Sequence, residues 1–118
     1  MMGVYEEWRD EFAKILDERF YTLSWLDCQV TNGAIGCMGN EQAAILYEIE
    51  TYPTGWCELK GMAAAGDLTI IKEVLIPAAE SLAKTMGCGS AEIASREGWA
   101  RVLPDYEIHQ VSIKKVFK

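Results

Sequence analysis

A stretch of small residues, GMAAAGDLTIIKEVL (61–75), leads from a predicted strand directly into a helical pattern. A strand, a small-residue turn and a helix start in this order often hold a phosphate, because free backbone N–H groups and the helix dipole point at the anion. The carboxylate of Asp67 would repel an anion, and as an N-cap it can accept hydrogen bonds from the same N–H groups. We therefore expect a capped structural turn, with phosphate binding as the alternative. The candidate contacts are Ala64, Ala65, Gly66, Asp67 and Leu68.

Cysteine and histidine are the other residue types with reactive or metal-binding side chains. The cysteines are Cys28, Cys37, Cys57 and Cys88, and none stands in a C-x-x-C pair. The one histidine, His109, has no partner histidine, so no metal site is expected. We expect free, mostly buried thiols in a reducing cytosol, while the even cysteine count leaves disulfides open.

Length, charge and composition limit the classes of function. The chain has 118 residues, a formal net charge of −7 and a sequence pI of about 4.7. Half of its residues are hydrophobic and a quarter are charged, as is ordinary for a folded domain. The acidic charge disfavours binding to nucleic acid or to an anionic membrane surface. No apolar run approaches the roughly 20 residues of a membrane helix, and the charged start is not typical of a secretory signal.

Two stretches have the apolar period of a helix. The first predicts an amphipathic helix from Val4 to Phe20, with charged residues between apolar ones. The second runs from Leu68 to Met86, with Asp67 as N-cap and Gly87 as the stop. Pro77 lies inside the second stretch and is expected to kink or split it, because proline lacks an N–H and collides with the carbonyl four residues earlier.

The segment between these helices predicts a meander of strands. Residues 21–38 are interpreted as one irregular strand followed by a short strand near 34–38. Residues 43–50 predict a further strand, with Ile45, Tyr47 and Ile49 on one face. A turn containing Pro53 and Gly55 then leads to its hairpin partner at 56–62.

The end of the chain predicts three more elements. Residues 90–95 form a short strand after a helix, and a crossover of this kind places it parallel to 56–62. A short helix at 96–103 and a closing strand at 107–117 follow. The order predicts a single α/β (α+β) domain over residues 1–118. Its sheet is mostly antiparallel with one parallel pair around the main helix, and helices pack on the faces.

Three motifs in the second half of the chain stand out: Gly66-Asp67 in the small-residue turn, Gly87-Cys88 at the helix end, and REGWARVL (96–103) before the last strand. Together they resemble small GNAT-like (acetyltransferase-fold) proteins encoded by tailed bacteriophages, over residues 43–117. The resemblance implies a GNAT-like fold and, if the protein is active, acetyl-CoA as its cofactor. The group itself is largely without assigned activity.

Active GNAT enzymes hold the pyrophosphate of acetyl-CoA with a turn rich in Gly and Arg. The corresponding residues here, 63–68, include one glycine and no arginine. The enzymes also use a tyrosine after the short helix as general acid for the departing thiolate. Leu103 falls at that position and has no proton to donate. Tyr106 is the remaining candidate, although it follows Pro104 and is expected to face elsewhere.

The resemblance also implies a carboxylate base on the central strands. Glu58 is best placed by strand position, ahead of Glu48 and Glu50. Whether Glu92 points inward or outward is left open. The ordinary role for such carboxylates is a solvated strand face.

Arg96, Trp99 and Arg101 form the most distinctive cluster of the chain. Trp99 is expected to anchor the short helix on the sheet, with a recognition surface as the alternative. Arg96 could pair with Asp67 or Glu92, or contact a ligand. These three residues are the candidates for a binding surface.

Three functions remain open from the sequence. The favoured one is a phage-encoded GNAT-like protein that lacks acetyl transfer and binds a protein, either a virion or packaging component or a host factor. The second is a divergent acyl-CoA-dependent N-acyltransferase that uses the 64–68 backbone and Glu58. The third is an oligomeric structural module, since a short sheet leaves an edge for a second copy. The expected location is the host cytoplasm, with virion association as an alternative.

Overall fold

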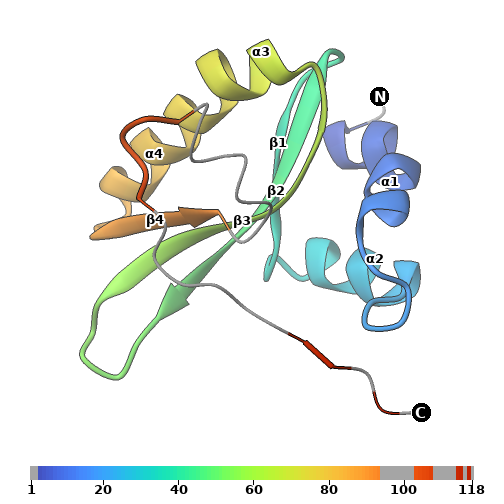
Figure 1. The fold of residues 1–118 in the computed structure, drawn as a ribbon, viewed down its shortest axis with the longest axis horizontal. Helices are drawn as coiled ribbons and strands as arrows, with labels where there is room; N and C mark the ends of the chain where they lie inside the picture. Colours follow the sequence, from blue (N-terminus) through green and yellow to red (C-terminus); the bar gives the residue numbers. More distant parts are fainter. Residues whose placement is uncertain (1–2, 94–102, 108–113, 116, 118) are drawn as a thin grey trace.

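The structure is a computed structural model that describes residues 3–93, 103–107, 114, 115 and 117. A four-stranded sheet in the order β1-β2-β3-β4 stands between two groups of helices (Figure 1). This mixed α/β architecture is the fold class that the sequence predicts. The strands are β1 Gly36–Gly39, β2 Ala43–Thr51, β3 Cys57–Gly66 and β4 Ser90–Ile93. The helices are α1 Val4–Ile15, α2 Leu23–Thr31, α3 Leu68–Ile70, the π-helical turn η1 Ile71–Leu75, and α4 Ile76–Thr85.

The strand pairing is the predicted one. β1 pairs with β2, and β2 with β3, in antiparallel fashion. β4 runs parallel to β3 after the helical crossover. One boundary is wrong: β3 continues past residue 62 to Gly66, so Ala64, Ala65 and Gly66 belong to the strand and not to the turn. Pairing with Ala43, Ala44 and Ile45 of β2 keeps these small residues extended.

A β-bulge interrupts β3 at its middle. Leu46 of β2 lies opposite Ala63, but the next residue, Tyr47, lies opposite Gly61. Met62 is therefore an extra residue in β3, and such a residue bends the strand that contains it.

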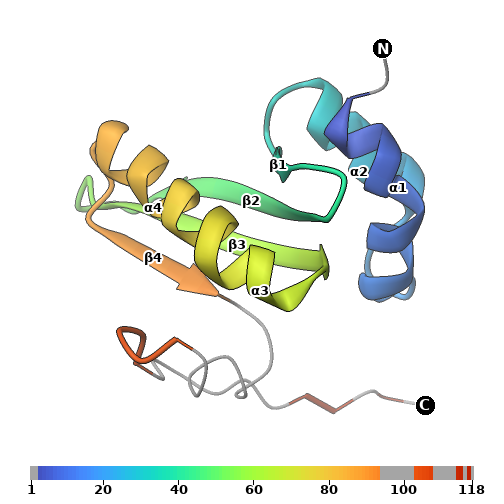
Figure 2. The same cartoon turned by 90° about the horizontal axis from the view of Figure 1, so that it is seen from above.

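The sheet has a core on each face (Figure 2). On the face of α1 and α2, Phe12, Leu26 and Leu46 are fully buried. On the face of α3, η1 and α4, the core includes Ile45 and Leu59 of the sheet. Alternation along each strand divides the side chains between the two cores. The prediction that Ile45, Tyr47 and Ile49 share a face is confirmed, since all three pack in the second cluster.

The first helix is shorter than predicted. It ends at Ile15 and not at Phe20. The reason lies at Asp17, whose carboxylate accepts a hydrogen bond from the Arg19 backbone N–H at 3.0 Å. A side chain that bonds the backbone in this way competes with helical hydrogen bonds. Phe20 is consequently about half exposed and does not join the core.

The irregular strand predicted within 21–38 is wrong, because Leu23–Thr31 form helix α2. Thr22 caps this helix by accepting a hydrogen bond from the Trp25 N–H at 3.1 Å. Burial of Leu26 against the sheet then outweighs the strand preference of its neighbours. The short strand predicted near 34–38 is confirmed as β1.

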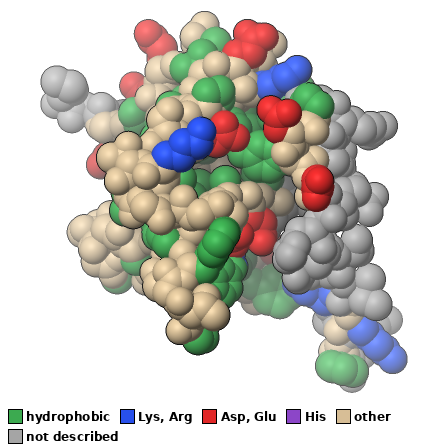
Figure 3. Space-filling view, turned by 90° about the vertical axis from the view of Figure 1, so that its left-hand side faces the viewer, with side chains coloured by type: hydrophobic (Ala, Val, Ile, Leu, Met, Phe, Trp, Pro, Cys, Tyr) green, Lys and Arg blue, Asp and Glu red, His purple; other side chains and the backbone are tan. Residues whose placement is uncertain are grey.

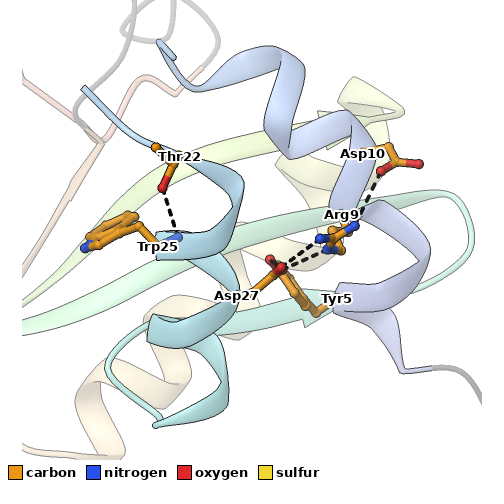
Figure 4. A network of polar contacts seen from close by, with 6 residues as sticks. All are labelled: Tyr5, Arg9, Asp10, Thr22, Trp25 and Asp27. Carbon is orange, nitrogen blue, oxygen red and sulfur yellow. Dashed lines mark hydrogen bonds and ion pairs between the residues drawn. The ribbon is translucent and has the colours of Figure 1, made fainter. Parts of the chain in front are cut away.

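A cluster of polar side chains joins α1 to α2 (Figure 4). Arg9 donates two hydrogen bonds to the Asp27 carboxylate, at 2.8 and 2.7 Å. Tyr5 donates its hydroxyl hydrogen to the same carboxylate at 2.5 Å. These donors, Arg9 first and then Tyr5, lower the pKa of Asp27 from 3.8 to about 2. The charged form of Asp27 is thus stabilised in the folded state.

Replacement of Asp27 by asparagine is expected to lower the free energy of unfolding at pH 7 by roughly 1 kcal/mol, because the contact is partly solvent-exposed. A carboxyl group whose pKa is lower in the folded than in the unfolded protein stabilises the fold at pH values above its unfolded pKa. The difference in unfolding free energy between wild type and variant should therefore vanish as the pH falls from about 4 to about 2. Urea unfolding across this range measures it. Asp10→Asn is the matched control, since Asp10 is largely exposed at 3.9 Å from Arg9. An Asp27→Asn deficit that persisted at pH 2 would contradict this origin.

The second helix is split, as its proline predicts. A regular turn, α3, is followed by the π-helical turn η1 and then by α4, which has Pro77 in its first turn. The Ile76 N–H bonds the carbonyl of Ile71, five residues back. This wider turn accommodates the pyrrolidine ring, which cannot sit beneath the carbonyl four residues earlier.

The helix start after β3 is capped as predicted. The Asp67 carboxylate accepts a hydrogen bond from the Ile70 N–H at 3.1 Å. Gly66, just before it, has a φ of 103°, and a Cβ there would lie 2.4 Å from the Gln42 carbonyl oxygen. The backbone conformation and the close approach of Gln42 therefore account for the single glycine of this segment.

Asp67→Ala is expected to lower the free energy of unfolding by about 1 kcal/mol, because the Ile70 N–H loses its acceptor. Asp67→Asn, which also caps well, should stay within a few tenths of a kcal/mol of wild type. Denaturant titration at neutral pH compares the three proteins. Equal losses in both variants would mean that charge, and not capping, stabilises this helix start.

Candidate functional site

An open cavity of about 320 Å³ lies where the paired part of β4 ends. The pairs between β3 and β4 end at Gly61 with Ile93, and the bulge at Met62 follows. Four consecutive residues of β3, 61–64, line the cavity. Met62 and Ala63 pack on the α1 side of the sheet and Ala64 packs on the α4 side, so the cavity lining includes residues of both faces.

The cavity walls come from helices on both sides of the sheet. Ile15 of α1 lines it from one side, and Ile71 and Ile76 line it from the other. The lining is predominantly aliphatic. The volume lies within the range of small-molecule sites, roughly 300–1,000 Å³.

Three polar side chains stand in this apolar wall: Tyr106, Glu80 of α4 and Glu92 of β4. The Tyr106 hydroxyl donates a hydrogen bond to Glu80 Oε2 at 2.5 Å. Burial, followed by the Glu80 carboxylate, raises the pKa of Tyr106 well above its ordinary value. Tyr106 is therefore a neutral hydroxyl donor at physiological pH.

The placement of Tyr106 corrects one expectation. Its position past Pro104 predicts a side chain that faces elsewhere, yet it lines the cavity. A turn explains this, since the Tyr106 N–H bonds the Leu103 carbonyl at 3.0 Å. Leu103 is buried in the core on the α4 face and anchors the segment.

Glu58 lies outside the lining of the cavity. Its carboxylate accepts hydrogen bonds from the Tyr52 hydroxyl at 2.9 Å and the Ser90 hydroxyl at 2.8 Å. The Trp56 indole N–H in turn donates to the Ser90 oxygen at 2.9 Å. The structure thus joins Tyr106 to Glu80, places Glu92 in the same cavity lining opposite Lys60 in the register, and leaves Glu58 in a separate polar network.

The predicted phosphate contacts, residues 64–68, lie at the end of β3 and the start of the following helix. Of these residues, Ala64 also lines the cavity. The Asp67 N–H bonds the Gln42 carbonyl at 2.9 Å, and the Ile71 N–H bonds the Asp67 carbonyl at 3.0 Å. With Ile70 bonded to the Asp67 carboxylate, three N–H groups of this helix start have partners within the protein. The binding-surface candidates Arg96, Trp99 and Arg101 lie outside the described residues, as does His109.

The four cysteines are free. The expectation of mostly buried thiols is wrong, because Cys28 is exposed and the other three are only half-buried. Burial, assisted by Glu6, raises the pKa of Cys37 to about 11, and burial beside Cys57 does the same for Cys88. These two thiols are thus weak nucleophiles at neutral pH.

The described part of the chain contains no group of three or more His, Cys, Asp and Glu side chains suited to a metal ion. Within the same ranges, no helix has the length and apolarity needed to cross a bilayer. Figure 3 shows the molecular face over β4 and α4, on which acidic side chains lie among exposed hydrophobic ones.

Of the polar residues in the cavity wall, Glu80 is the hardest to identify from the sequence. It lies one turn after Ile76 and next to Ala79 in α4, both of which are buried. On a helical wheel it therefore borders the apolar face, where a carboxylate can reach a cavity edge. The partner that makes it notable, Tyr106, lies 26 residues away. No local sequence pattern indicates that Glu80 and Tyr106 form a pair.

No protein-family profile matches this sequence, and no curated protein matches it. Solved structures do resemble it. A Trypanosoma brucei acetyltransferase has a TM-score of 0.64 at 10% identity, covering 94% of this chain and 91% of its own. An aminoglycoside acetyltransferase from an uncultured soil metagenomic sample, solved with sisomicin, has a TM-score of 0.67 at 10% identity, covering 97% and 88%.

A transcriptional regulator from Bacillus halodurans has a TM-score of 0.62 at 13% identity, covering 95% of each chain. At such low identities the likeness concerns the fold alone. The chain has the GNAT-type acetyltransferase fold.

Proposed function

We propose that this chain is a divergent N-acyltransferase that moves an acyl group from an acyl-CoA thioester to an amine. The observation that carries the proposal is the cavity at the bulge, whose lining includes residues of both faces of the sheet. Two substrates can enter such a cavity from opposite sides and meet at its centre, as group transfer requires. The acetyltransferases among the structural neighbours, one of them an aminoglycoside acetyltransferase, support this reading.

The wall residues suit the proton transfers of this reaction. The amine nitrogen attacks the thioester carbonyl carbon and forms the C–N bond, and the C–S bond then breaks with its electron pair left on sulfur. To give its proton to that sulfur, the Tyr106 hydroxyl must turn from Glu80 Oε2 toward the thioester. Glu92 takes the proton that the nitrogen loses, directly or through water. Solvent then restores both groups.

Glu58 is the other candidate base, acting from the strand position that the resemblance favours. Its carboxylate already accepts two hydrogen bonds outside the cavity. Glu92 lines the cavity and is therefore the better-placed base. Glu58 would need a bridging water to reach the same nitrogen.

The second candidate function is binding of a protein without acyl transfer. One observation favours it: the Asp67 carboxylate occupies the helix start that would face a pyrophosphate. In this version the chain is a phage-encoded protein that binds a virion or packaging component or a host factor, or associates with itself. The phage origin and the host-cytoplasmic location rest on the sequence resemblance and are part of this candidate.

The deciding experiment is an acyl-transfer assay with acetyl-CoA and a panel of amines, including a diamine, an aminoglycoside and a lysine peptide. Amide formation detected by mass spectrometry, with stoichiometric thiol release, supports the transferase. Glu92→Gln should slow transfer by about 100-fold, the usual scale for a general base. Glu58→Gln should leave the rate within a few-fold, and a loss as large as that of Glu92→Gln would make Glu58 the base. Absence of any amide with every amine would favour the binding protein.

A further inference from the structure

We infer that the donor is recognised by its acyl-pantetheine arm and not by its nucleotide. This inference rests on the proposed function, because it names what that same cavity selects. It predicts that a thioester without adenosine or phosphates is about as good a ligand as acetyl-CoA.

The first argument is that the protein itself already uses part of the hydrogen-bonding capacity of the helix start after β3. The N–H groups of Asp67, Ile70 and Ile71 are bonded to the Gln42 carbonyl, the Asp67 carboxylate and the Asp67 carbonyl. An anion would have to displace these acceptors to reach those three N–H groups. Among the described residues the Leu68 and Thr69 N–H groups have no hydrogen-bond partner, so a phosphate would have to share this helix start with the fixed Asp67 carboxylate.

The second argument is charge. The Asp67 carboxylate places a negative charge at the very position a pyrophosphate would approach. Lys72 is the nearby cation of this helix, and it is exposed to solvent one turn further on. A screened lysine cannot offset a carboxylate that is fixed by a hydrogen bond to the helix start.

The third argument is that the cavity fits the reactive end of the donor. Its volume of about 320 Å³ lies at the small end of the range for small-molecule sites, roughly 300–1,000 Å³. An acetyl group, its sulfur and the adjoining cysteamine amide form a fragment that suits a site of this smaller size. The aliphatic lining suits the methylene groups and the thioester, and Tyr106 places its hydroxyl, bonded to Glu80, in the same wall.

The test compares three probes by calorimetry at constant ionic strength: acetyl-CoA, S-acetylpantetheine and adenosine 3′,5′-bisphosphate. The two thioesters should bind with Kd values within about threefold of each other, and the nucleotide should not bind. Each charge-assisted phosphate contact would favour acetyl-CoA by roughly tenfold or more. A preference above about 30-fold therefore overturns this inference but leaves the acyltransferase intact. If neither thioester binds at millimolar concentration, both proposals fall.

Substitutions in the cavity and at the helix start test separately what each contributes to thioester binding. A Cβ at Gly61 meets Glu92 O at 3.7 Å and Ile93 Cγ1 at 3.8 Å, which is ordinary contact. Gly61→Val should therefore fold, fill part of the cavity and weaken both thioesters by at least about tenfold. Ala78→Val adds the same type of bulk at an exposed position of α4, and binding should not change. Gly61→Ala is the milder substitute if the valine variant melts early.

Asp67→Asn keeps the cap but removes the charge. It should strengthen acetyl-CoA binding by about three- to tenfold and leave S-acetylpantetheine unchanged. An equal effect on both thioesters, or no effect on either, would overturn the assignment of Asp67 as the group that rejects the nucleotide.

Discussion

Replacement of Tyr106 by phenylalanine is expected to slow acyl transfer by about 100-fold or more, with thioester affinity nearly unchanged. The ring remains in the cavity wall, so apolar contacts are kept, and only the hydroxyl is lost. That hydroxyl is the neutral donor in the lining, held by Glu80 at 2.5 Å. The departing thiolate would then have to take its proton from water.

Tyr52→Phe is the matched control for this experiment. It removes the same hydroxyl from a tyrosine that bonds Glu58 and lies outside the cavity lining. Single-turnover rates with acetyl-CoA and the preferred amine separate the chemical step from binding. Equal rates for Tyr106→Phe and wild type would remove Tyr106 from the chemistry. A loss in thioester affinity with an unchanged rate would make it a binding residue.

Phe12→Ala is expected to cost about 3–5 kcal/mol in the free energy of unfolding, enough to unfold a marginal domain at 37 °C. Phe12 is fully buried, at 0% exposure, among Leu26, Leu46 and Ala44. Truncation would leave a cavity between α1 and the sheet that the surrounding strands cannot close.

Phe20→Ala provides the contrast, since the Phe20 side chain is about half exposed beyond the end of α1. It should change stability by about 1 kcal/mol or less. Urea titrations of both variants, monitored by tryptophan fluorescence, give the two numbers. A Phe12→Ala loss below about 1.5 kcal/mol would mean that the α1 core is far more plastic than its burial implies.

Elements with a strong period or a sharp boundary signal were predictable from the sequence. The β2–β3 hairpin, the capped start at Asp67 and the split at Pro77 follow from alternation, capping and the missing proline N–H. The parallel placement of β4 follows from the helical crossover. These signals act within a few residues, so the sequence contains them directly.

The irregular features were not predictable in the same way. Helix α2 carries strand-leaning residues and is fixed by burial of Leu26 against a sheet that forms elsewhere in the chain. The inward placement of Tyr106 depends on a turn to Leu103 and on Glu80, which lies 26 residues away. The site is thus set by long-range contacts, whereas the fold is largely set by local ones.

The bulge at Met62 has a consequence for how this strand tolerates change. Before it, side chains of one parity point toward α1, and after it the opposite parity does so, because Met62 and Ala63 both pack on the α1 side. Removal of that one residue would place Ala63 directly after Gly61, still opposite Leu46 and Tyr47, so Ala63 to Gly66 would keep their present faces and β3 would lose only its bend. Met62 therefore contributes curvature to β3, while the two regular stretches on either side of it determine which side chains reach each core.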